Sequence, residues 1–287
     1  MRTSELKKLL VNGEDKFLLT GDAGVETENE ISLFSSLKTN LKVKVVPSEP
    51  LSSRLLDLRS VKSKKEADNI IKAQRIAEKA FYDILDYIKV GMTEKLIAAT
   101  LNYKMMCYGA ESPSFDTIVV SGQNSSLPHG VPTEKKIEKG DFITMDFGAM
   151  YNGYCSDMTR TVAVGFATDE MKKVYDTVLN AQLAGIDAAQ AGRTGAEIDR
   201  VARDIISSAG YGQYFGHALG HGVGIEIHEE PKVSPSNGEV LPEGSVITIE
   251  PGIYIPGHFG VRIEDMLYIK TNGNTNLTNY PKNLIIL

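Results

Sequence analysis

Several acidic side chains of this chain interrupt apolar stretches, where an unpaired carboxylate would be costly. Asp146 lies in Phe-Ile-Thr-Met-Asp-Phe, Glu250 in Thr-Ile-Glu-Pro-Gly, and Glu264 in Val-Arg-Ile-Glu-Asp. His221 lies among glycines, where the backbone can approach closely and no bulky neighbour shields the imidazole. Carboxylates and an imidazole of this kind are ligands for a divalent metal ion.

A hairpin adds a fourth carboxylate to this set. Asn152-Gly153 between apolar runs predicts a two-residue turn, because both central positions need a positive φ. That turn sets a register in which Asp146 faces Thr159 and Gly148 faces Asp157, so both aspartates share one face of the sheet. The hairpin alone leaves a second interpretation open, in which Asp157 caps a turn and Asp146 pairs with a nearby arginine.

The number of carboxylates favours two metal ions over one. Four carboxylates in one cleft carry a charge that two divalent cations would balance and one would not. The sequence therefore predicts a dinuclear centre with these ligands: Asp146, Asp157, His221, Glu250 and Glu264.

The secondary-structure elements around these residues are predicted to occur twice along the sequence. Apolar residues at helical spacing predict a helix from Lys64, and a second helix capped by Thr93 that reaches about Tyr108. Two more helices are predicted after Thr168 and after Thr194, each pair being followed by strands. Four residues recur at an offset of 101, Asp86, Gly91, Thr93 and Gly109 matching Asp187, Gly192, Thr194 and Gly210.

This repeat predicts the fold class, which is α+β. We expect a pseudo-two-fold duplicated antiparallel sheet with helices on its outer face and a cleft between the halves. The strands are expected at residues 117–120, 142–164, 222–227, 246–255 and 261–269.

The first part of the chain is expected to be separate. Residues 1–60 are interpreted as a truncated N-terminal α/β domain, and residues 61–287 as the catalytic domain. Within the first, we expect a strand at residues 16–20, a helix at 30–37, a strand at 41–46 and a connector at 51–65.

Composition limits the partners. The net charge of −6 gives no overall attraction to nucleic acid or to anionic membranes. The start of the chain lacks the apolar core of a signal peptide, and no uncharged run is long enough to span a bilayer. Two cysteines without CxxC spacing fit a reducing compartment, so we expect a cytoplasmic protein.

At the five ligand positions the sequence resembles the pita-bread (creatinase/aminopeptidase fold) metallopeptidases, which include methionine aminopeptidases, aminopeptidase P and prolidase. The resemblance covers about residues 60–287. It implies that Asp146 holds one metal ion, that His221 and Glu250 hold the other, and that Asp157 and Glu264 bridge the pair. Mn²⁺ suits these ligands best, while Co²⁺, Zn²⁺ and Fe²⁺ stay open.

Finer motifs resemble one branch of that family. Ser156-Asp157-Met158-Thr159-Arg160 looks like the aminopeptidase P and prolidase pattern, and Arg262 points the same way. The resemblance implies an exopeptidase for short peptides with proline at the second position, which could be a homodimer. A methionine aminopeptidase and a catalytically inactive binding module of the same fold are the alternatives.

The remaining polar residues receive roles from chemistry and from the resemblance. Glu250 is the expected general base. His228 and His129 resemble the histidines that bind substrate and stabilise the tetrahedral intermediate. His217 and Arg262 are expected to line the substrate pocket, where Arg262 could bind a carboxylate. His258 lies next to a Pro-Gly turn and is expected to be a loop residue.

Overall fold

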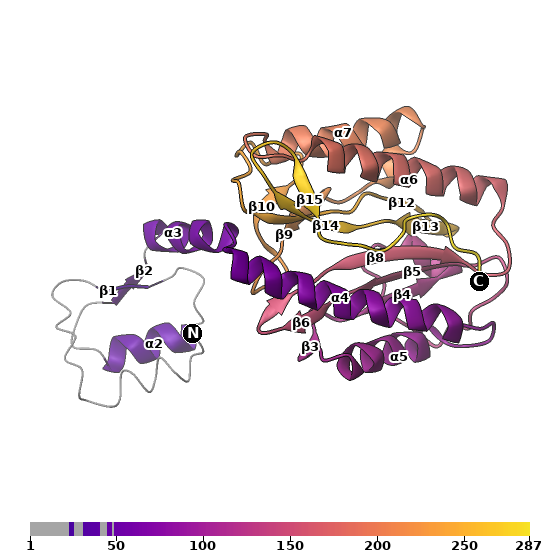
Figure 1. Ribbon diagram of the computed structural model, residues 1–287, viewed down its shortest axis with the longest axis horizontal. Helices are drawn as coiled ribbons and strands as arrows, with labels where there is room; N and C mark the ends of the chain where they lie inside the picture. Colours follow the sequence, from indigo (N-terminus) through magenta and orange to yellow (C-terminus); the bar gives the residue numbers. More distant parts are fainter. Residues whose placement is uncertain (1–22, 26–30, 41–44, 48) are drawn as a thin grey trace. The chain divides into compact units, whose positions relative to one another are not determined.

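The computed structural model describes residues 23–25, 31–40, 45–47 and 49–287, which are coloured along the sequence in Figure 1. The chain divides into two compact units, Met1–Leu58 and Arg59–Leu287. The assignment of the first 60 residues to a truncated α/β domain, and of residues 61–287 to a catalytic domain, stays a prediction.

The first unit contains a small parallel sheet and a helix. Strand β1 (Ala23–Val25) pairs with β2 (Val45–Pro47), and α2 (Ile31–Asn40) lies between them in the sequence. The predicted helix at 30–37 corresponds to α2. The strand predicted at 16–20 lies outside the described residues, as does most of the one predicted at 41–46.

The predicted connector at 51–65 is wrong for most of its length, because helix α3 covers Glu49–Ser60. Pro50 is tolerated in the first helical turn, where its missing N–H would have no helical partner. Leu51 and Leu55 then follow at helical spacing.

Four helices of the second unit begin where the sequence predicts. They are α4 (Lys64–Tyr87), α5 (Glu94–Cys107), α6 (Asp169–Ala188) and α7 (Gly195–Ser208). Ser63, Thr93, Thr168 and Thr194 are their N-caps, and each side chain accepts a hydrogen bond from the backbone N–H three residues later. Local capping chemistry therefore fixes these boundaries.

The backbone confirms the predicted repeat. Gly91 and Gly192, which precede the second helix of each pair, have φ values of 91° and 82°. Gly109 and Gly210, which follow it, have φ values of 98° and 88°. Glycine is favoured at all four positions because an L-residue with a side chain rarely adopts such angles.

The strands of the first half form two antiparallel sheets, with the orders β4-β5-β8 and β3-β6-β7. Their bounds are β3 (Ser112–Pro113), β4 (Ile118–Ser121), β5 (Phe142–Phe147), β6 (Ala149–Tyr151), β7 (Tyr154–Cys155) and β8 (Met158–Ala163). A short 3₁₀-helix, η1 (Gly122–Ser126), follows β4.

The predicted hairpin register is confirmed. Asn152 and Gly153 both have positive φ, at 49° and 75°, and they form the turn between β6 and β7. Asp146 pairs with Thr159 across β5 and β8. The turn chemistry therefore fixes where Asp146 lies relative to the strand that follows Asp157.

The second half forms a five-stranded sheet in the order β10-β9-β11-β14-β15 and a separate pair, β12-β13. The bounds are β9 (Gly220–Gly222), β10 (Glu229–Val233), β11 (Val246–Ile249), β12 (Gly252–Ile255), β13 (Phe259–Arg262), β14 (Asp265–Ile269) and β15 (Asn274–Asn276). Another 3₁₀-helix, η2 (Gly212–Tyr214), precedes them.

The strand predicted at 222–227 is wrong, because β9 ends at Gly222. The backbone N–H of Gly224 donates to the carbonyl of Glu226, and its own carbonyl accepts from the N–H of Cys155. The chain therefore turns here instead of extending. The long strands predicted at 246–255 and 261–269 are each divided, at Glu250-Pro251 and at Ile263-Glu264.

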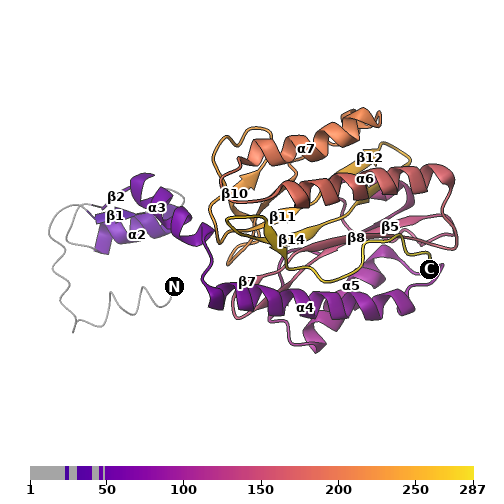
Figure 2. The same ribbon diagram turned by 45° about the horizontal axis from the view of Figure 1, so that its top comes forward.

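The helix pairs lie on opposite sides of the strands, α4 and α5 on one side and α6 and α7 on the other (Figures 1 and 2). Each pair has its own apolar core: Phe81 and Leu101 pack with Met145 in the first half, and Val178 and Ile198 pack with Ile247 in the second. The predicted α+β duplicated fold is confirmed.

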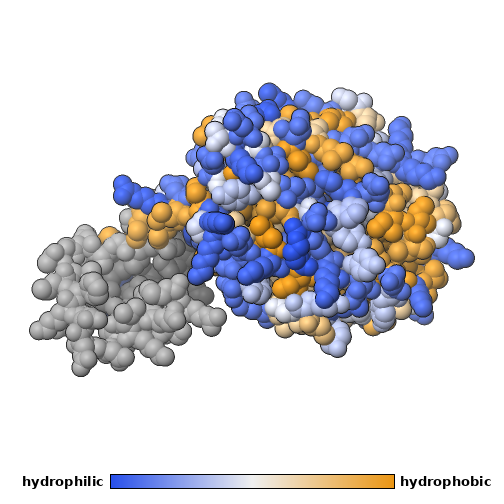
Figure 3. Space-filling model, in the orientation of Figure 1, coloured by the Kyte–Doolittle hydropathy of each residue, from blue (hydrophilic) through white to orange (hydrophobic). Residues whose placement is uncertain are grey.

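The surface is mixed in character. On the face drawn in Figure 3, apolar side chains form separate patches among polar ones. Within the described part of the chain, no helix combines the length and the apolar character needed to cross a membrane.

Candidate metal centre

The predicted acidic ligands lie where strands break or pair. Asp157 lies between β7 and β8, and Glu264 between β13 and β14. Glu250 follows β11 and precedes Pro251, which has no N–H to continue a ladder. Ile249 pairs with Asp265, so Glu250 and Glu264 come together in the second half as Asp146 and Asp157 do in the first.

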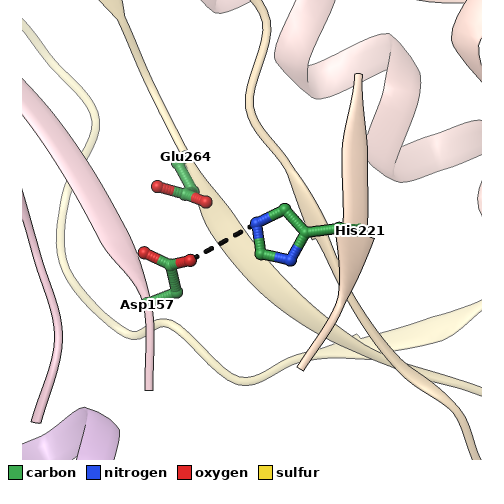
Figure 4. Close-up of side chains that lie close together, drawn as sticks. All are labelled: Asp157, His221 and Glu264. Carbon is green, nitrogen blue, oxygen red and sulfur yellow. Dashed lines mark ion pairs between the residues drawn. The ribbon is translucent and has the colours of Figure 1, made fainter. Parts of the chain in front are cut away.

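His221 is the meeting point of these acids. One ligand atom each from Asp157, His221 and Glu264 lies within 4.8 Å of the others, and Figure 4 shows the imidazole facing the two carboxylates. Nε2 of His221 is 3.5 Å from Oδ2 of Asp157 and 3.4 Å from Oε1 of Glu250. The structure therefore brings together four of the five predicted ligands, with Asp157, Glu250 and Glu264 around the imidazole of His221.

Asp146, the fifth predicted ligand, contacts an arginine. Its Oδ2 accepts a hydrogen bond of 2.6 Å from Nη2 of Arg262. The second interpretation of the hairpin, in which Asp146 pairs with an arginine, describes this contact. Oδ1 of Asp146 is buried and has no hydrogen-bond partner within the described structure, so one oxygen is left for another ligand.

Burial and mutual repulsion make this cluster unfavourable as a group of bare anions. Burial, followed by the neighbouring carboxylates, raises the pKa of Asp157 and of Glu264 well above the ordinary range. Burial also raises the pKa of Glu250 to about 8, although Arg262 opposes this change. These three groups would each hold a proton, or a cation, in preference to a bare charge.

The imidazole of His221 presents a lone pair to the acids. Its Nδ1 lies 3.0 Å from the carbonyl oxygen of Gly222 and must donate to it, which leaves Nε2 unprotonated in the neutral ring. Burial keeps the ring neutral by lowering its pKa to about 4. A histidine whose other nitrogen donates to a backbone carbonyl is the usual form of a metal-ligating histidine.

The donor set therefore fits a divalent cation. Nε2 of His221 and the carboxylate oxygens beside it all present lone pairs, so a positive ion among them would satisfy each one. Oδ1 of Asp157, like Oδ1 of Asp146, is buried without a hydrogen-bond partner in the described structure. Both orphaned atoms are acceptors, which is what a cation site needs.

Arg262 and His217 belong to a hydrogen-bonded chain beside the acids. Nη1 of Arg262 donates to the hydroxyl of Tyr254 at 2.8 Å, and that hydroxyl donates to Nε2 of His217 at 2.9 Å. Nδ1 of His217 donates to the carbonyl of Ala218, and burial lowers the pKa of the ring to about 4. His217 is therefore a neutral acceptor here.

Tyr254 is a buried member of this chain of contacts that the sequence analysis did not predict. Its ring lies in β12 and its hydroxyl joins Arg262 to His217. The sequence around it, Gly-Ile-Tyr-Ile-Pro, is apolar and carries no sign of a polar role. The contacts with Arg262 and His217 in the structure reveal it.

The other three histidines are exposed. The ring of His228 lies 4.4 Å from that of His221, edge to face. His129 follows Pro128, whose carbonyl accepts a hydrogen bond from Arg262. His258 lies in the turn between β12 and β13, and its Nε2 is 3.2 Å from an exposed carboxylate oxygen of Glu170.

A buried ion pair holds the segment that carries His228. Both side chains of the pair Lys62–Glu229 are only 2% exposed, with Nζ 3.0 Å from Oε2. Nη2 of Arg59 donates to the other oxygen of Glu229 at 2.6 Å, and the N–H of Glu226 donates to the same oxygen. Nothing in the sequence marks this pair, whose members are 167 residues apart in the chain.

Replacing Lys62 with methionine is expected to lower the free energy of unfolding by about 3 kcal/mol, because it leaves one oxygen of a buried carboxylate without its cation. Urea denaturation of the variant measures this. Lys95→Met is the matched control, since the pair Lys95–Glu134 is exposed and should contribute less than about 1 kcal/mol. Equal losses in the two variants would contradict the prediction.

Comparison with known proteins assigns the family. Residues 68–271 match the family model of metallopeptidase family M24, so the chain belongs to this family. Its members carry divalent metal ions, in agreement with the donor set described above.

Relatives and solved structures agree with this assignment. The Xaa-Pro dipeptidase of Pyrococcus furiosus is 46% identical over 266 residues, which cover 93% of this chain and 76% of the relative. The structure of an Xaa-Pro dipeptidase from Bacillus anthracis superimposes with a TM-score of 0.89 at 46% identity, over 93% of this chain and 75% of that one. An X-Pro aminopeptidase from Thermotoga maritima MSB8 gives 0.88 at 42%, over 99% and 79%.

Proposed function

We propose that this protein is a metal-dependent exopeptidase that hydrolyses the bond between an N-terminal residue and a following proline. The observation that carries the proposal is the cluster of acceptor atoms around the unprotonated Nε2 of His221. The relatives named Xaa-Pro dipeptidase and X-Pro aminopeptidase support the proline-directed substrate class.

Two divalent cations are proposed at this cluster. Asp157 and Glu264 would bridge them, His221 and Glu250 would bind one, and the free oxygen of Asp146 would bind the other. Mostly hard oxygen donors with one imidazole suit Mn²⁺. When bound, the cations would polarise the scissile carbonyl and lower the pKa of a water molecule.

The chain's own residues move protons and orient the substrate. Glu250 accepts the proton of the attacking water and returns it to the leaving amine. His228, in edge-to-face contact with His221, and His129 are proposed to hydrogen-bond the substrate. Arg262 holds Asp146 and Tyr254, so its first role is to orient these two groups.

The sequence left two other functions open, a methionine aminopeptidase and an inactive binding module. A methionine aminopeptidase would cleave after methionine and would not require proline. An inactive binding module would lack some of the ligand residues, whereas all five are present here, and Asp157, Glu250 and Glu264 lie around the imidazole of His221. The substrates of the named relatives favour the proline-directed activity.

A peptide panel tests the proposal. With Mn²⁺ supplied, Ala-Pro and Ala-Pro-Ala are expected to release alanine at least about 100-fold faster, in kcat/KM, than Met-Ala releases methionine. The chelated protein is the control and should release neither. Preference for Met-Ala would support the methionine aminopeptidase instead, and no release from any peptide by fully loaded protein would favour the binding module.

A further inference from the structure

Glu94, the first residue of helix α5, has a fully buried side chain that takes no part in the metal cluster. Its two oxygens accept six hydrogen bonds, all from neutral groups of three residues. Ser121 gives its N–H and hydroxyl, Thr133 gives its N–H and hydroxyl, and the amide of Asn124 reaches both oxygens.

These three donors bracket one loop. Ser121 is the last residue of β4, Asn124 lies in η1, and Thr133 lies at the other end of the segment 122–132. One carboxylate therefore closes both ends of this loop. The loop carries His129, which the proposed function places against the substrate.

The middle of the loop contacts the other half of the molecule. The carbonyl of Pro128 accepts from Nη1 of Arg262 at 3.2 Å, and Arg262 also holds Asp146. The hydroxyl of Ser125 accepts from the N–H of Gly260 at 2.9 Å, where a Cβ on the glycine would lie 2.1 Å from the carbonyl oxygen of Ser125. The position of the loop is thus tied to the arginine beside the metal ligands.

The second half of the internal repeat has no carboxylate at the position of Glu94. The N–H of Glu94 donates to the carbonyl of Lys135, and in the second half the N–H of Gly195 donates in the same way to Glu239. Gly195 occupies the place of Glu94 at the same offset of 101 residues, and a side chain is excluded there because a Cβ would lie 2.3 Å from the carbonyl oxygen of Lys232. The corresponding segment of that half, 223–236, carries His228 and is held by the buried pair Lys62–Glu229 instead.

We propose that Glu94 is a positioning residue of the hydrolytic site, which holds loop 122–132 so that His129 keeps its place. The inference rests on the proposed function for the role of His129. A carboxylate suits the task because its two oxygens only accept, and every group that faces them donates.

The test is Glu94→Gln in the full chain. Glutamine keeps the size but turns one acceptor oxygen into an NH₂ group that faces donors, so one end of the loop loses its anchor. We expect faster hydrogen exchange confined to residues 121–133, unchanged metal content, and a kcat/KM for Ala-Pro reduced about 10- to 100-fold. Glu197→Gln, at the exposed start of α7, is the matched control and should change neither the hydrogen exchange of residues 121–133 nor kcat/KM.

A double-variant cycle separates positioning from general support of the fold. If Glu94 acts through His129, the variant that carries both Glu94→Gln and His129→Ala should be no slower than His129→Ala alone. The proposal would be overturned if the two substitutions multiply in their effects on kcat/KM. It would also be overturned if hydrogen exchange rises uniformly along the chain, or if exchange in the loop does not change.

The proposal can still be tested if the glutamine variant does not fold or if the proposed function fails. If Glu94→Gln does not fold, Thr133→Val removes one hydroxyl donor, keeps the carboxylate and should loosen the same loop. If the loaded wild-type chain cleaves no Xaa-Pro peptide, the proposed function fails separately. Hydrogen exchange of the loop in the Glu94→Gln variant would then still decide whether Glu94 holds the loop.

Discussion

Glu250→Gln is expected to lower kcat for Ala-Pro by about 10³- to 10⁴-fold, because the amide can neither accept a proton from water nor return it to the leaving amine. The substitution preserves shape. Oε1 of Glu250 lies 3.4 Å from Nε2 of His221 and accepts a hydrogen bond from the hydroxyl of Thr248 at 3.2 Å, and an amide oxygen can replace it in both contacts. The loss should therefore appear in kcat more than in KM.

This variant needs a measurement of bound metal and a control variant. Metal content must be determined beside kcat, since Glu250 is also a proposed ligand and lost metal would imitate lost proton transfer. Glu243→Gln is the matched control, because that carboxylate is exposed on the same segment just before β11, and its kcat should stay within about twofold of wild type. Turnover near the wild-type value at full metal content would remove Glu250 as the base.

The parts of the fold that the sequence predicted are those set by local chemistry. The Asn152-Gly153 turn needs two positive φ angles, and this requirement fixed the register that places Asp146 opposite Thr159. Side chains such as Thr93 and Thr194 cap their helices through hydrogen bonds only three residues away. Such signals can be read without knowing the rest of the chain.

The clustering of the acidic side chains could be predicted because the arrangement of helices and strands is repeated within the chain. A carboxylate recurs at matching places in the two halves, as Asp146 and Glu250, and paired strands then bring each beside a second acid. The repeat thus supplied long-range information that periodicity within one element lacks. It could not supply the contacts that differ between the halves.

The partners in those contacts could not be identified from the sequence, because most of them lie far apart in it. Arg262 and Asp146 are 116 residues apart, and nothing near either one marks the other as its partner. Tyr254 lies in an apolar run, and its polar role depends on Arg262 and His217. The turn after Gly222 depends on the N–H of Cys155, which belongs to the other half of the fold.

Removing the metal ions is expected to abolish hydrolysis and to lower the melting temperature, by roughly 5 to 10 °C at pH 8. Without cations, burial and the neighbouring carboxylates make the ionised forms of Asp157 and Glu264 unfavourable, and burial does the same to Glu250. Bound cations would remove this cost in the folded state alone, because the unfolded chain does not bring the ligands together. Differential scanning fluorimetry of chelated and reloaded protein measures the change.

The loss should depend on pH in a definite direction. The pKa of Glu250 is about 8 in the metal-free fold and near 4.5 in the unfolded chain, so between these values the fold binds more protons and loses stability as pH rises. His221 and His217 have pKa values of about 4 in the fold against 6.5 unfolded, so they oppose this trend only below pH 6.5. Above pH 6.5 these two histidines no longer oppose the carboxylates.

The metal-free melting temperature is therefore expected to fall steadily from pH 6.5 to 8.5, while that of the loaded protein stays flatter because the cations balance the ionised acids. Asp157→Asn supplies the internal control, since removing one carboxylate from the cluster should raise the metal-free melting temperature at pH 8 and flatten its dependence on pH. A metal-free melting temperature that rises across this range, or that matches the loaded protein at pH 8, would mean that these acids do not share a cation site.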